Sequence, residues 1–239
     1  MFASRRDLRY GLATMIEFAE DVQDLIAGYR RFRSHRYREA RDLFRRLRDG
    51  QQPATMIIAC ADSRADPAMI FDAAPGELFA VRNVAALVPP YEETTGLHGV
   101  SAALEFAVTM LKVKQLVVMG HGGCGGIAAS LAAADDRPVG RFIAPWVEIA
   151  AEARDAVLRN ESIPRTDWQQ AVEQGAVAQS LRNLMTFPFV RTAVERGSLH
   201  MDGAWFSIGK GELQWRNPET GAFSVVDAEG DLPQPGANI

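Results

Sequence analysis

Two cysteines and one histidine stand where they can bind a metal ion. Cys60 begins the segment Cys60-Ala-Asp-Ser-Arg64, and His121 and Cys124 lie in Gly120-His-Gly-Gly-Cys-Gly-Gly126. The 239-residue chain has no other cysteine. Two thiolates and one imidazole form a known zinc ligand set of catalytic sites, in which the fourth position is left to water. The pattern therefore predicts a Zn²⁺ site made by Cys60, His121 and Cys124.

Each cysteine motif follows a short apolar run that is typical of a buried β-strand. The first run is Thr55-Met-Ile-Ile-Ala59 and the second is Gln115-Leu-Val-Val-Met119. In an open parallel sheet, ligands gather outside the carboxyl ends of the strands. Motifs that are far apart in the sequence are therefore expected to meet at one edge of the sheet.

The same motifs allow two other interpretations. Gly120 to Gly125 matches the G-x-G-x-x-G pattern of dinucleotide-binding loops. However, it follows the third expected strand instead of the first, and no acidic residue ends a strand about 20 residues later, as that fold requires. The cysteines could also be small buried apolar residues. The His-x-x-Cys spacing and the position of Cys60 at a strand end favour metal binding.

The composition is that of a globular protein without a special partner. The formal net charge of −4 gives no global sign of binding to nucleic acid or to an anionic membrane. No stretch approaches the roughly 20 apolar residues that a membrane span needs. Two cysteines do not make a disulfide framework, and reduced thiols fit a cytoplasmic protein.

The order of expected elements indicates an α/β fold with a mainly parallel central sheet and flanking helices. Residues 7–47 are predicted to be helical, with arginines on a solvated face over packed aromatic residues, and this arm could pack on a second subunit. Strands and helices then alternate, which favours parallel pairing. The chain is interpreted as one domain: helical arm 1–50, α/β core 51–226 and loose tail 227–239. Expected strands are 55–60, 77–82, 115–119, 199–201, 204–208, 212–215 and 223–226, and expected helices include 67–71, 99–111 and 127–134.

With these motifs in place, the sequence resembles the β-class carbonic anhydrases. Cys-Ala-Asp-Ser-Arg followed by Gly-His-x-x-Cys-Gly carries the resemblance, and it extends over about residues 28–213. Gln51 and Val88-Pro-Pro-Tyr91 resemble the plant-type subgroup. Ile57 stands where the subgroup with an allosteric bicarbonate pocket has tryptophan, and Phe106 replaces a tyrosine that is frequent in plant-type enzymes, so its hydroxyl is lost.

The resemblance implies a zinc lyase, carbonate dehydratase, which hydrates CO₂ reversibly to bicarbonate and a proton through a zinc-bound hydroxide. In this family Asp62 and Arg64 form a catalytic dyad, and the Gln51 amide and the Gly125 N–H donate to substrate oxygens. An apolar pocket is expected from Phe79, Val84 and Phe106. Some of these groups come from a neighbouring subunit, so a homodimer or a dimer of dimers (a homotetramer) is implied.

Several points stay open in the sequence. Cys60, Asp62 and Arg64 alternate, so they point the same way if the strand continues. The Asp62 carboxylate either pairs with Arg64 or, once released, becomes a fourth zinc ligand that closes the site. Two thiolates neutralise the metal charge, so activity is expected to rise on the alkaline side of neutrality. The alternatives are a CS₂ or COS hydrolase on the same scaffold, or an inactive zinc-binding sensor or scaffold.

Overall fold

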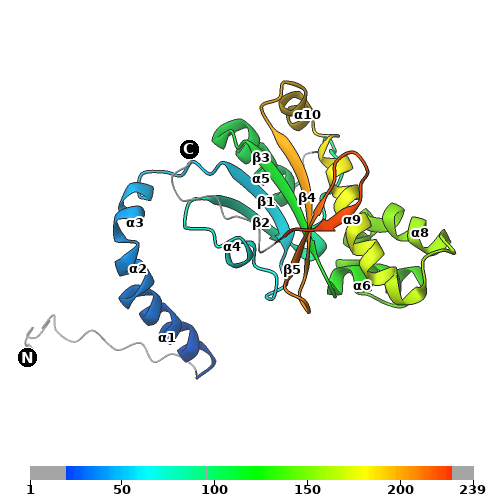
Figure 1. Ribbon diagram of the computed structural model, residues 1–239, viewed down its shortest axis with the longest axis horizontal. Coiled ribbons are helices and arrows are strands. Elements are labelled where there is room, and N and C mark those ends of the chain that lie inside the picture. The colour runs from blue at the N-terminus through cyan, green and yellow to red at the C-terminus, as the bar shows by residue number, and fades with distance from the viewer. Residues whose placement is uncertain (1–19, 95, 228–239) are drawn as a thin grey trace, which may run out of the picture. The chain divides into compact units, whose positions relative to one another are not determined.

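The computed structural model describes residues 20–94 and 96–227 of the chain (Figure 1). Its contacts divide the chain into two compact units, Met1–Gly50 and Gln51–Ile239. Within the described ranges, no helix has both the length and the apolar character that a membrane crossing requires. The expected helix over residues 7–19 and the expected tail from residue 228 onward lie outside the described residues.

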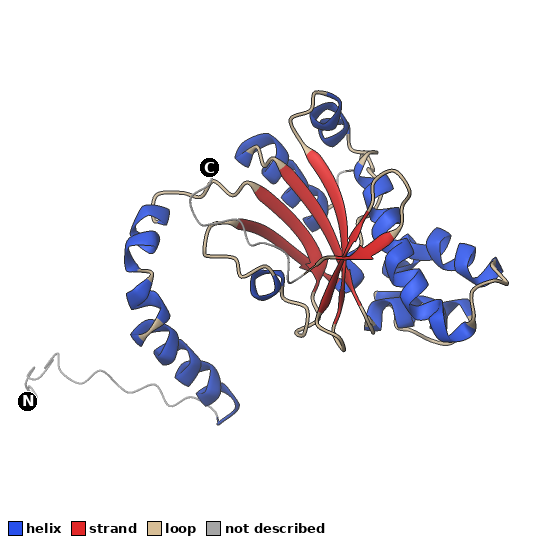
Figure 2. Ribbon diagram, in the orientation of Figure 1, coloured by secondary structure: helices blue, strands red, loops and turns tan. Residues whose placement is uncertain are grey.

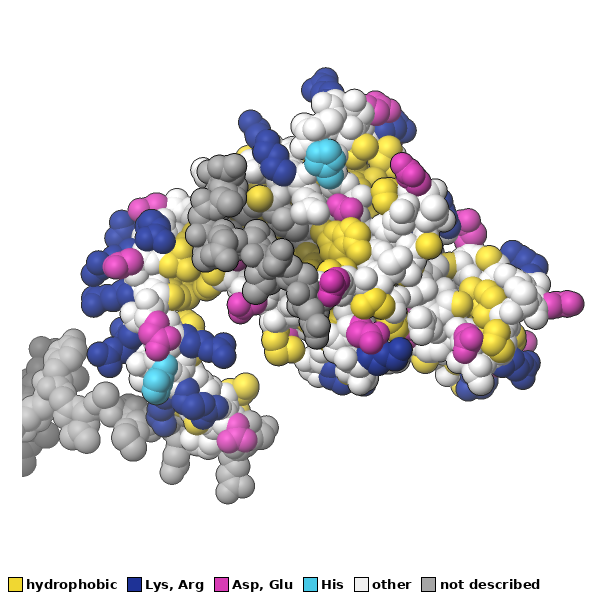
Figure 3. Space-filling model, in the orientation of Figure 1, with side chains coloured by type: hydrophobic (Ala, Val, Ile, Leu, Met, Phe, Trp, Pro, Cys, Tyr) yellow, Lys and Arg dark blue, Asp and Glu magenta, His cyan; other side chains and the backbone are white. Residues whose placement is uncertain are grey.

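The first unit is a helical arm in three pieces. Helix α1 spans Glu20–Ser34, α2 spans Arg36–Glu39 and α3 spans Arg41–Leu47. The aromatic rings of Phe32, Tyr37 and Phe44 pack edge to face or tilted, with centroids 5.0 to 6.0 Å apart. Arginine side chains gather on these helices (Figure 3), as the sequence predicted. The described part of the arm is therefore helical, with interruptions at His35 and Ala40.

The second unit is built on one twisted six-stranded sheet (Figure 2). The strand order is β2-β1-β3-β4-β5-β6. The first four strands pair in parallel, whereas β5 pairs antiparallel with both β4 and β6. This confirms the predicted α/β fold with a mainly parallel sheet. The bounds are β1 Thr55–Cys60, β2 Leu78–Asn83, β3 Gln115–His121, β4 His200–Ser207, β5 Glu212–Arg216 and β6 Phe223–Val225.

The central strands β1 and β3 are buried on both faces, which explains their unbroken apolar sequences. Helices flank the sheet, and the long helix α9 packs against β3 and β4. Three short 3₁₀ turns cover Val84–Ala86, Glu148–Ala150 and Arg165–Asp167, and a π-helical segment covers Phe106–Leu111. The helices are α4 Pro67–Ile70, α5 Gly99–Glu105, α6 Gly125–Ala134, α7 Ile143–Val147, α8 Ala151–Arg159, α9 Trp168–Leu184 and α10 Pro188–Glu195.

Most element boundaries lie within one or two residues of those expected, and three differences affect the packing or the site. The strands predicted at 199–201 and 204–208 are one strand, β4, that continues through Gly203. A Cβ at Gly203 would lie 2.9 Å from a methyl group of Val177 on α9, so this glycine permits close helix packing and does not mark a break. Strand β3 extends to His121, and α6 starts at Gly125 instead of Ile127. The last two changes shorten the loop between β3 and α6 to Gly122, Gly123 and Cys124.

Candidate metal centre

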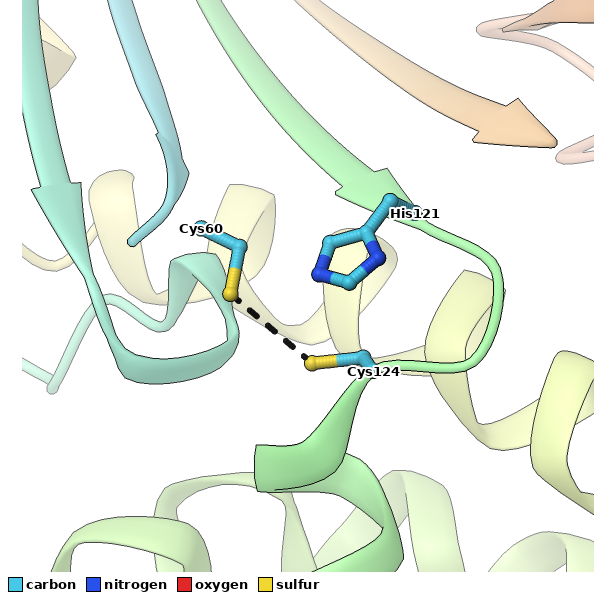
Figure 4. A group of neighbouring side chains, drawn as sticks. All are labelled: Cys60, His121 and Cys124. Atoms are coloured by element: carbon cyan, nitrogen blue, oxygen red, sulfur yellow. Dashed lines mark hydrogen bonds between the residues drawn. The ribbon is translucent and has the colours of Figure 1, made fainter. Parts of the chain in front are cut away.

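The three predicted ligands converge at the carboxyl edge of the sheet. Cys60 is the last residue of β1, His121 is the last residue of β3, and Cys124 directly precedes α6. Their side chains point toward one another (Figure 4), and the three candidate ligand atoms all lie within 4.8 Å of each other. All three residues are buried, His121 to 1% exposure. The topology thus brings together residues 60, 121 and 124 as expected from the strand ends.

The geometry and the donor atoms fit a zinc ion. The two sulfurs are 3.9 Å apart, and sulfurs bound at about 2.3 Å to a tetrahedral zinc are roughly 3.8 Å apart. His121 Nδ1 lies 3.1 Å from the Gly122 carbonyl oxygen, which it meets as a donor. His121 Nε2 is buried and has no hydrogen-bond partner among the described residues. A buried, unpaired lone pair is costly, and metal coordination at Nε2 with Nδ1–H bound to a carbonyl is the usual arrangement.

The two thiols share one hydrogen bond and do not ionise independently. The bond from Cys124 lowers the pKa of Cys60 to about 4, although burial opposes this. The same bond, together with burial, raises the pKa of Cys124. The opposite directions of these shifts mean that Cys60 gives up its proton more readily than Cys124 does. A metal ion requires both sulfurs as thiolates, so metal binding must release any proton that they still carry.

Asp62 and Arg64 form a close ion pair beside this group. The Asp62 carboxylate accepts from Arg64 Nε at 2.9 Å, Arg64 Nη2 at 2.8 Å and the Arg64 backbone N–H at 2.9 Å. These bonds hold the pKa of Asp62 well below its usual range. Asp62 Oδ2 lies 3.9 Å from His121 Nε2. Of the two positions that the sequence left open for this carboxylate, the structure has the one paired with Arg64.

The local backbone of this pair differs from the expected one. Strand β1 ends at Cys60, and the next residues form a turn in which the Ala65 N–H donates to the Asp62 carbonyl. The strand does not continue to residues 62 and 64, so the condition for their alternation with Cys60 is not met. The side chains of Asp62 and Arg64 meet because the turn folds them together.

Arg82 holds this turn from the neighbouring strand β2. Its guanidinium donates to the Cys60 carbonyl at 2.9 Å, to the Asp62 carbonyl, and to the Asp66 carboxylate at 2.7 Å. One side chain thus fixes the main chain on both sides of Ala61. Arg82 is the last residue of the strand expected at 77–82, but nothing in the sequence showed that its side chain would contact these carbonyls.

The expected substrate pocket is only partly assembled within this chain. The rings of Phe79 and Phe106 are 5.8 Å apart. Phe106 is 45% exposed and Val84 is 42% exposed, so apolar side chains face outward here. Gly125 is the first residue of α6, where an N–H has no acceptor inside the helix. Gln51 is exposed and makes no side-chain hydrogen bond within the described part of the chain.

The turn after β2 packs tightly against the start of α6. Ala85 and Ala86 have positive φ values of 65° and 55°, which is unusual for residues with a Cβ. The Asn83 side chain holds this turn, since it donates to the Leu87 carbonyl and accepts from the Leu87 N–H, both at 2.9 Å. A Cβ at Gly126 would lie 2.7 Å from a Val84 methyl group. Glycine at position 126 is therefore required for close packing.

Helix α9 contributes a buried carboxylate that the sequence reasoning missed. Glu173 is 2% exposed, and burial raises its pKa while its hydrogen bonds oppose that shift. It accepts from the Cys124 N–H, from Gln169 and from Trp205. The only available signal was a charged residue between Val172 and Ala176, two residues on the apolar face of the helix.

Comparisons with known proteins agree on one family. The family model described as "Carbonic anhydrase" matches residues 55–213. The chain is 36% identical over 193 residues to "Beta carbonic anhydrase 3" of Arabidopsis thaliana, covering 80% of this chain and 74% of the Arabidopsis protein.

Solved structures give the same result. The β-carbonic anhydrase CcaA superposes with a TM-score of 0.79 at 30% identity, covering 87% of this chain and 100% of that one. A structure from a study of two tetrameric β-carbonic anhydrases of the ascomycete Sordaria macrospora has a TM-score of 0.73 at 25% identity, covering 86% and 100%.

Proposed function

Because this chain belongs to the β-carbonic anhydrase family, we propose that it catalyses the reversible hydration of CO₂ to bicarbonate and a proton, with a zinc ion held by Cys60, His121 and Cys124. The observation that carries the proposal is the buried and unpaired His121 Nε2, which lies among two sulfurs and 3.9 Å from the Asp62 carboxylate. Three protein ligands leave one position for water, as in catalytic zinc sites, whereas structural sites have four protein ligands.

A bound Zn²⁺ supplies Lewis acidity and a water acidified enough to attack CO₂. The ion pair of Asp62 and Arg64 supplies the orientation. Arg64 holds the carboxylate by a two-pronged contact and keeps it ionised, so Asp62 acts as a hydrogen-bond acceptor and not as a donor. A carboxylate at this place would accept a hydrogen bond from the attacking water or hydroxide and aim its oxygen lone pair at the carbon, while it stays ionised. While it is paired with Arg64, the Asp62 carboxylate would not itself serve as a ligand to the metal.

The remaining polar and apolar groups receive the substrate. The free N–H of Gly125 is a donor for a carbonyl or bicarbonate oxygen, in the manner of an oxyanion hole. Phe79, Val84 and Phe106 provide an apolar surface that suits uncharged CO₂. These side chains are half-exposed or exposed in the single chain, so a covering partner is needed to exclude water from them.

The proposed covering partner is a second copy of this chain. Relatives with this fold include tetrameric enzymes. The exposed position of Gln51, together with the open apolar surface at Val84 and Phe106, supports a homodimer or a dimer of dimers in which Gln51 of the partner subunit completes the pocket. The two buried free thiols support a reducing compartment, and we place the protein in the cytoplasm.

Stopped-flow CO₂ hydration by the zinc-loaded protein tests the proposal. At about pH 8.5, above the roughly 7 expected for the water of a three-histidine site, turnover should be fast, and it should decline toward neutral pH. A zinc-loaded protein that is silent with CO₂ would overturn the proposal. Turnover of CS₂ or COS in its place would identify the related hydrolase, and silence with all three would identify a zinc-binding sensor or scaffold.

A further inference from the structure

Glu173 is a buried carboxylate that the proposed reaction does not use. It lies in the middle of α9 and its exposure is 2%. Burying a charged group is unfavourable unless hydrogen bonds compensate for the lost water. All three of its partners are N–H donors, which suits an ionised carboxylate. Oε1 accepts from the Cys124 backbone N–H at 2.8 Å and from Gln169 Nε2 at 2.7 Å, and Oε2 accepts from Trp205 Nε1 at 3.1 Å.

The same helix face holds the other side of the Cys124 main chain. Gln169 stands one helical turn before Glu173, and its Nε2 also donates to the Cys124 carbonyl at 3.0 Å. The N–H and the C=O of Cys124 are therefore both bound by α9. Cys124 is also the N-cap residue that directly precedes α6. Its main chain is thus fixed from outside the loop of three residues that joins β3 to α6.

Trp205 on β4 supports both the carboxylate and the loop. Its indole N–H binds Glu173, and a Cβ at Gly122 would lie 3.1 Å from its ring. The loop therefore rests directly on the indole. The Glu173 carboxylate of α9 therefore binds both the loop, at the Cys124 N–H, and strand β4, at the Trp205 indole.

We propose that Glu173 is a positioning residue that presets Cys124 for metal binding. By fixing the Cys124 backbone, it holds the sulfur 3.9 Å from that of Cys60, which is close to the separation of roughly 3.8 Å that tetrahedral zinc needs. The ordering of the loop then precedes metal binding, and its loss must appear as weaker metal affinity. The inference deepens the proposed function only through the metal, and it does not depend on which reaction the metal supports.

The hydrogen-bond pattern predicts a specific effect of Glu173→Gln. The amide has the same shape but only one acceptor oxygen. If that oxygen faces Cys124 and Gln169, the amide NH₂ faces the Trp205 N–H, and two donors meet. Removing the indole N–H by Trp205→Phe relieves this conflict. The double variant Glu173→Gln/Trp205→Phe should therefore bind metal more tightly than Glu173→Gln alone.

Zinc affinity measured by competition with a chelator tests the proposal without an activity readout. Loss of a hydrogen-bond partner behind a metal ligand lowers affinity about 10- to 100-fold, and we expect this for Glu173→Gln. The double variant should regain part of the loss, because Trp205→Phe removes the donor conflict but also the ring atoms nearest Gly122. Gln169→Ala, which keeps the carboxylate, should show a smaller loss. The thiolate-to-metal absorption of the Co²⁺-substituted protein should change in Glu173→Gln and return toward the wild-type spectrum in the double variant.

Leu184→Ala is the matched control for general destabilisation. Leu184 is a fully buried residue of the same helix, and it packs in a core cluster that contains none of the ligands. It should lower Tm without changing zinc affinity. The proposal is overturned if Glu173→Gln binds zinc like the wild type, if its loss equals that of Leu184→Ala at similar Tm, or if the double variant is no better. Should Glu173→Gln fail to fold, Gln169→Ala decides: wild-type affinity there overturns the proposal. Tight zinc binding in a wild type without CO₂ hydration would refute the proposed reaction alone.

Discussion

Replacing Asp62 by asparagine separates the role of this carboxylate from metal binding. The carboxylate now accepts three bonds from Arg64, at 2.8 to 2.9 Å. In the Asp62→Asn variant, one oxygen becomes an NH₂ group. If the remaining oxygen keeps the bonds from the Arg64 backbone and Nε, the NH₂ faces the guanidinium Nη2, and two donors oppose each other. The side chain then loses its charge, the hydrogen bond from Arg64 Nη2, and the acceptor oxygen that lies nearest His121.

The size of the effect follows from the role assigned to Asp62. Removing one preorganised hydrogen-bonding group from an active site typically costs about 10²- to 10³-fold in rate, or about 3 to 4 kcal/mol of barrier. We therefore expect kcat/KM for CO₂ hydration to fall by that factor in Asp62→Asn. Zinc content should stay at the wild-type level, because the three groups that fit the metal are Cys60, His121 and Cys124.

Stopped-flow CO₂ hydration at about pH 8.5 measures kcat/KM directly, and zinc is quantified in the same samples. The pH is alkaline because two thiolate ligands would neutralise the charge of the metal and leave its water less acidic. Asp66→Asn is the matched control. Asp66 belongs to the same turn, pairs with Arg82 and caps α4, where asparagine caps equally well. Its rate should stay near that of the wild type. An Asp62→Asn protein with full zinc and undiminished kcat/KM would refute the reasoning, as would an equal loss in Asp66→Asn.

Three further changes have defined outcomes. Gly126→Ala places a Cβ 2.7 Å from a side-chain methyl group, so it should lower the free energy of unfolding, measured by urea titration, by about 1 to 3 kcal/mol. The control Gly125→Ala places a Cβ with no atom within 4 Å and should leave this free energy unchanged. Equal unfolding curves for the two variants would contradict the packing argument. Arg82→Lys replaces the planar guanidinium by a single ammonium group that cannot bind two carbonyls at once. Zinc should therefore dissociate faster from this variant in a chelator competition assay. A dissociation rate equal to that of the wild type would contradict the prediction. The Asp62 carboxyl, followed by NMR, should remain ionised below the ordinary value of about 3.9, because Arg64 lowers its pKa. The pair therefore stabilises the fold above that value and ceases to do so as the pH falls below it, and Arg64→Ala should move the titration upward.

The ligands could be predicted from the sequence because their signals are local. Cys60 and His121 end apolar strands, and parallel strands expose their carboxyl ends at one edge, so a reader of the sequence can bring them together. The error at Gly203 has the opposite origin. A glycine within a strand has the same local appearance whether it ends the strand or admits a neighbouring helix, and only the position of Val177 distinguishes the two.

The groups that hold the ligands could not be predicted, since their function depends on tertiary contacts. Arg82 acts on carbonyls of a neighbouring strand, and a carbonyl has no sequence signature. Glu173 lies 49 residues after Cys124, and the distance along the chain says nothing about their contact. Gln51 is a different case, because the single chain leaves it exposed and its proposed role requires a second copy.

The architecture explains why these hidden contacts matter as much as the ligands. Cys60 and Cys124 come from different elements, and a different charged side chain fixes the main chain of each: Arg82 at the Cys60 carbonyl and Glu173 at the Cys124 amide. Their sulfurs are 3.9 Å apart, nearly twice the roughly 2.05 Å of a disulfide bond. Their separation is instead close to the roughly 3.8 Å between two sulfurs on a tetrahedral zinc ion. The two main-chain contacts, one on each cysteine, therefore hold the sulfurs at a spacing that suits a metal ion before the ion binds.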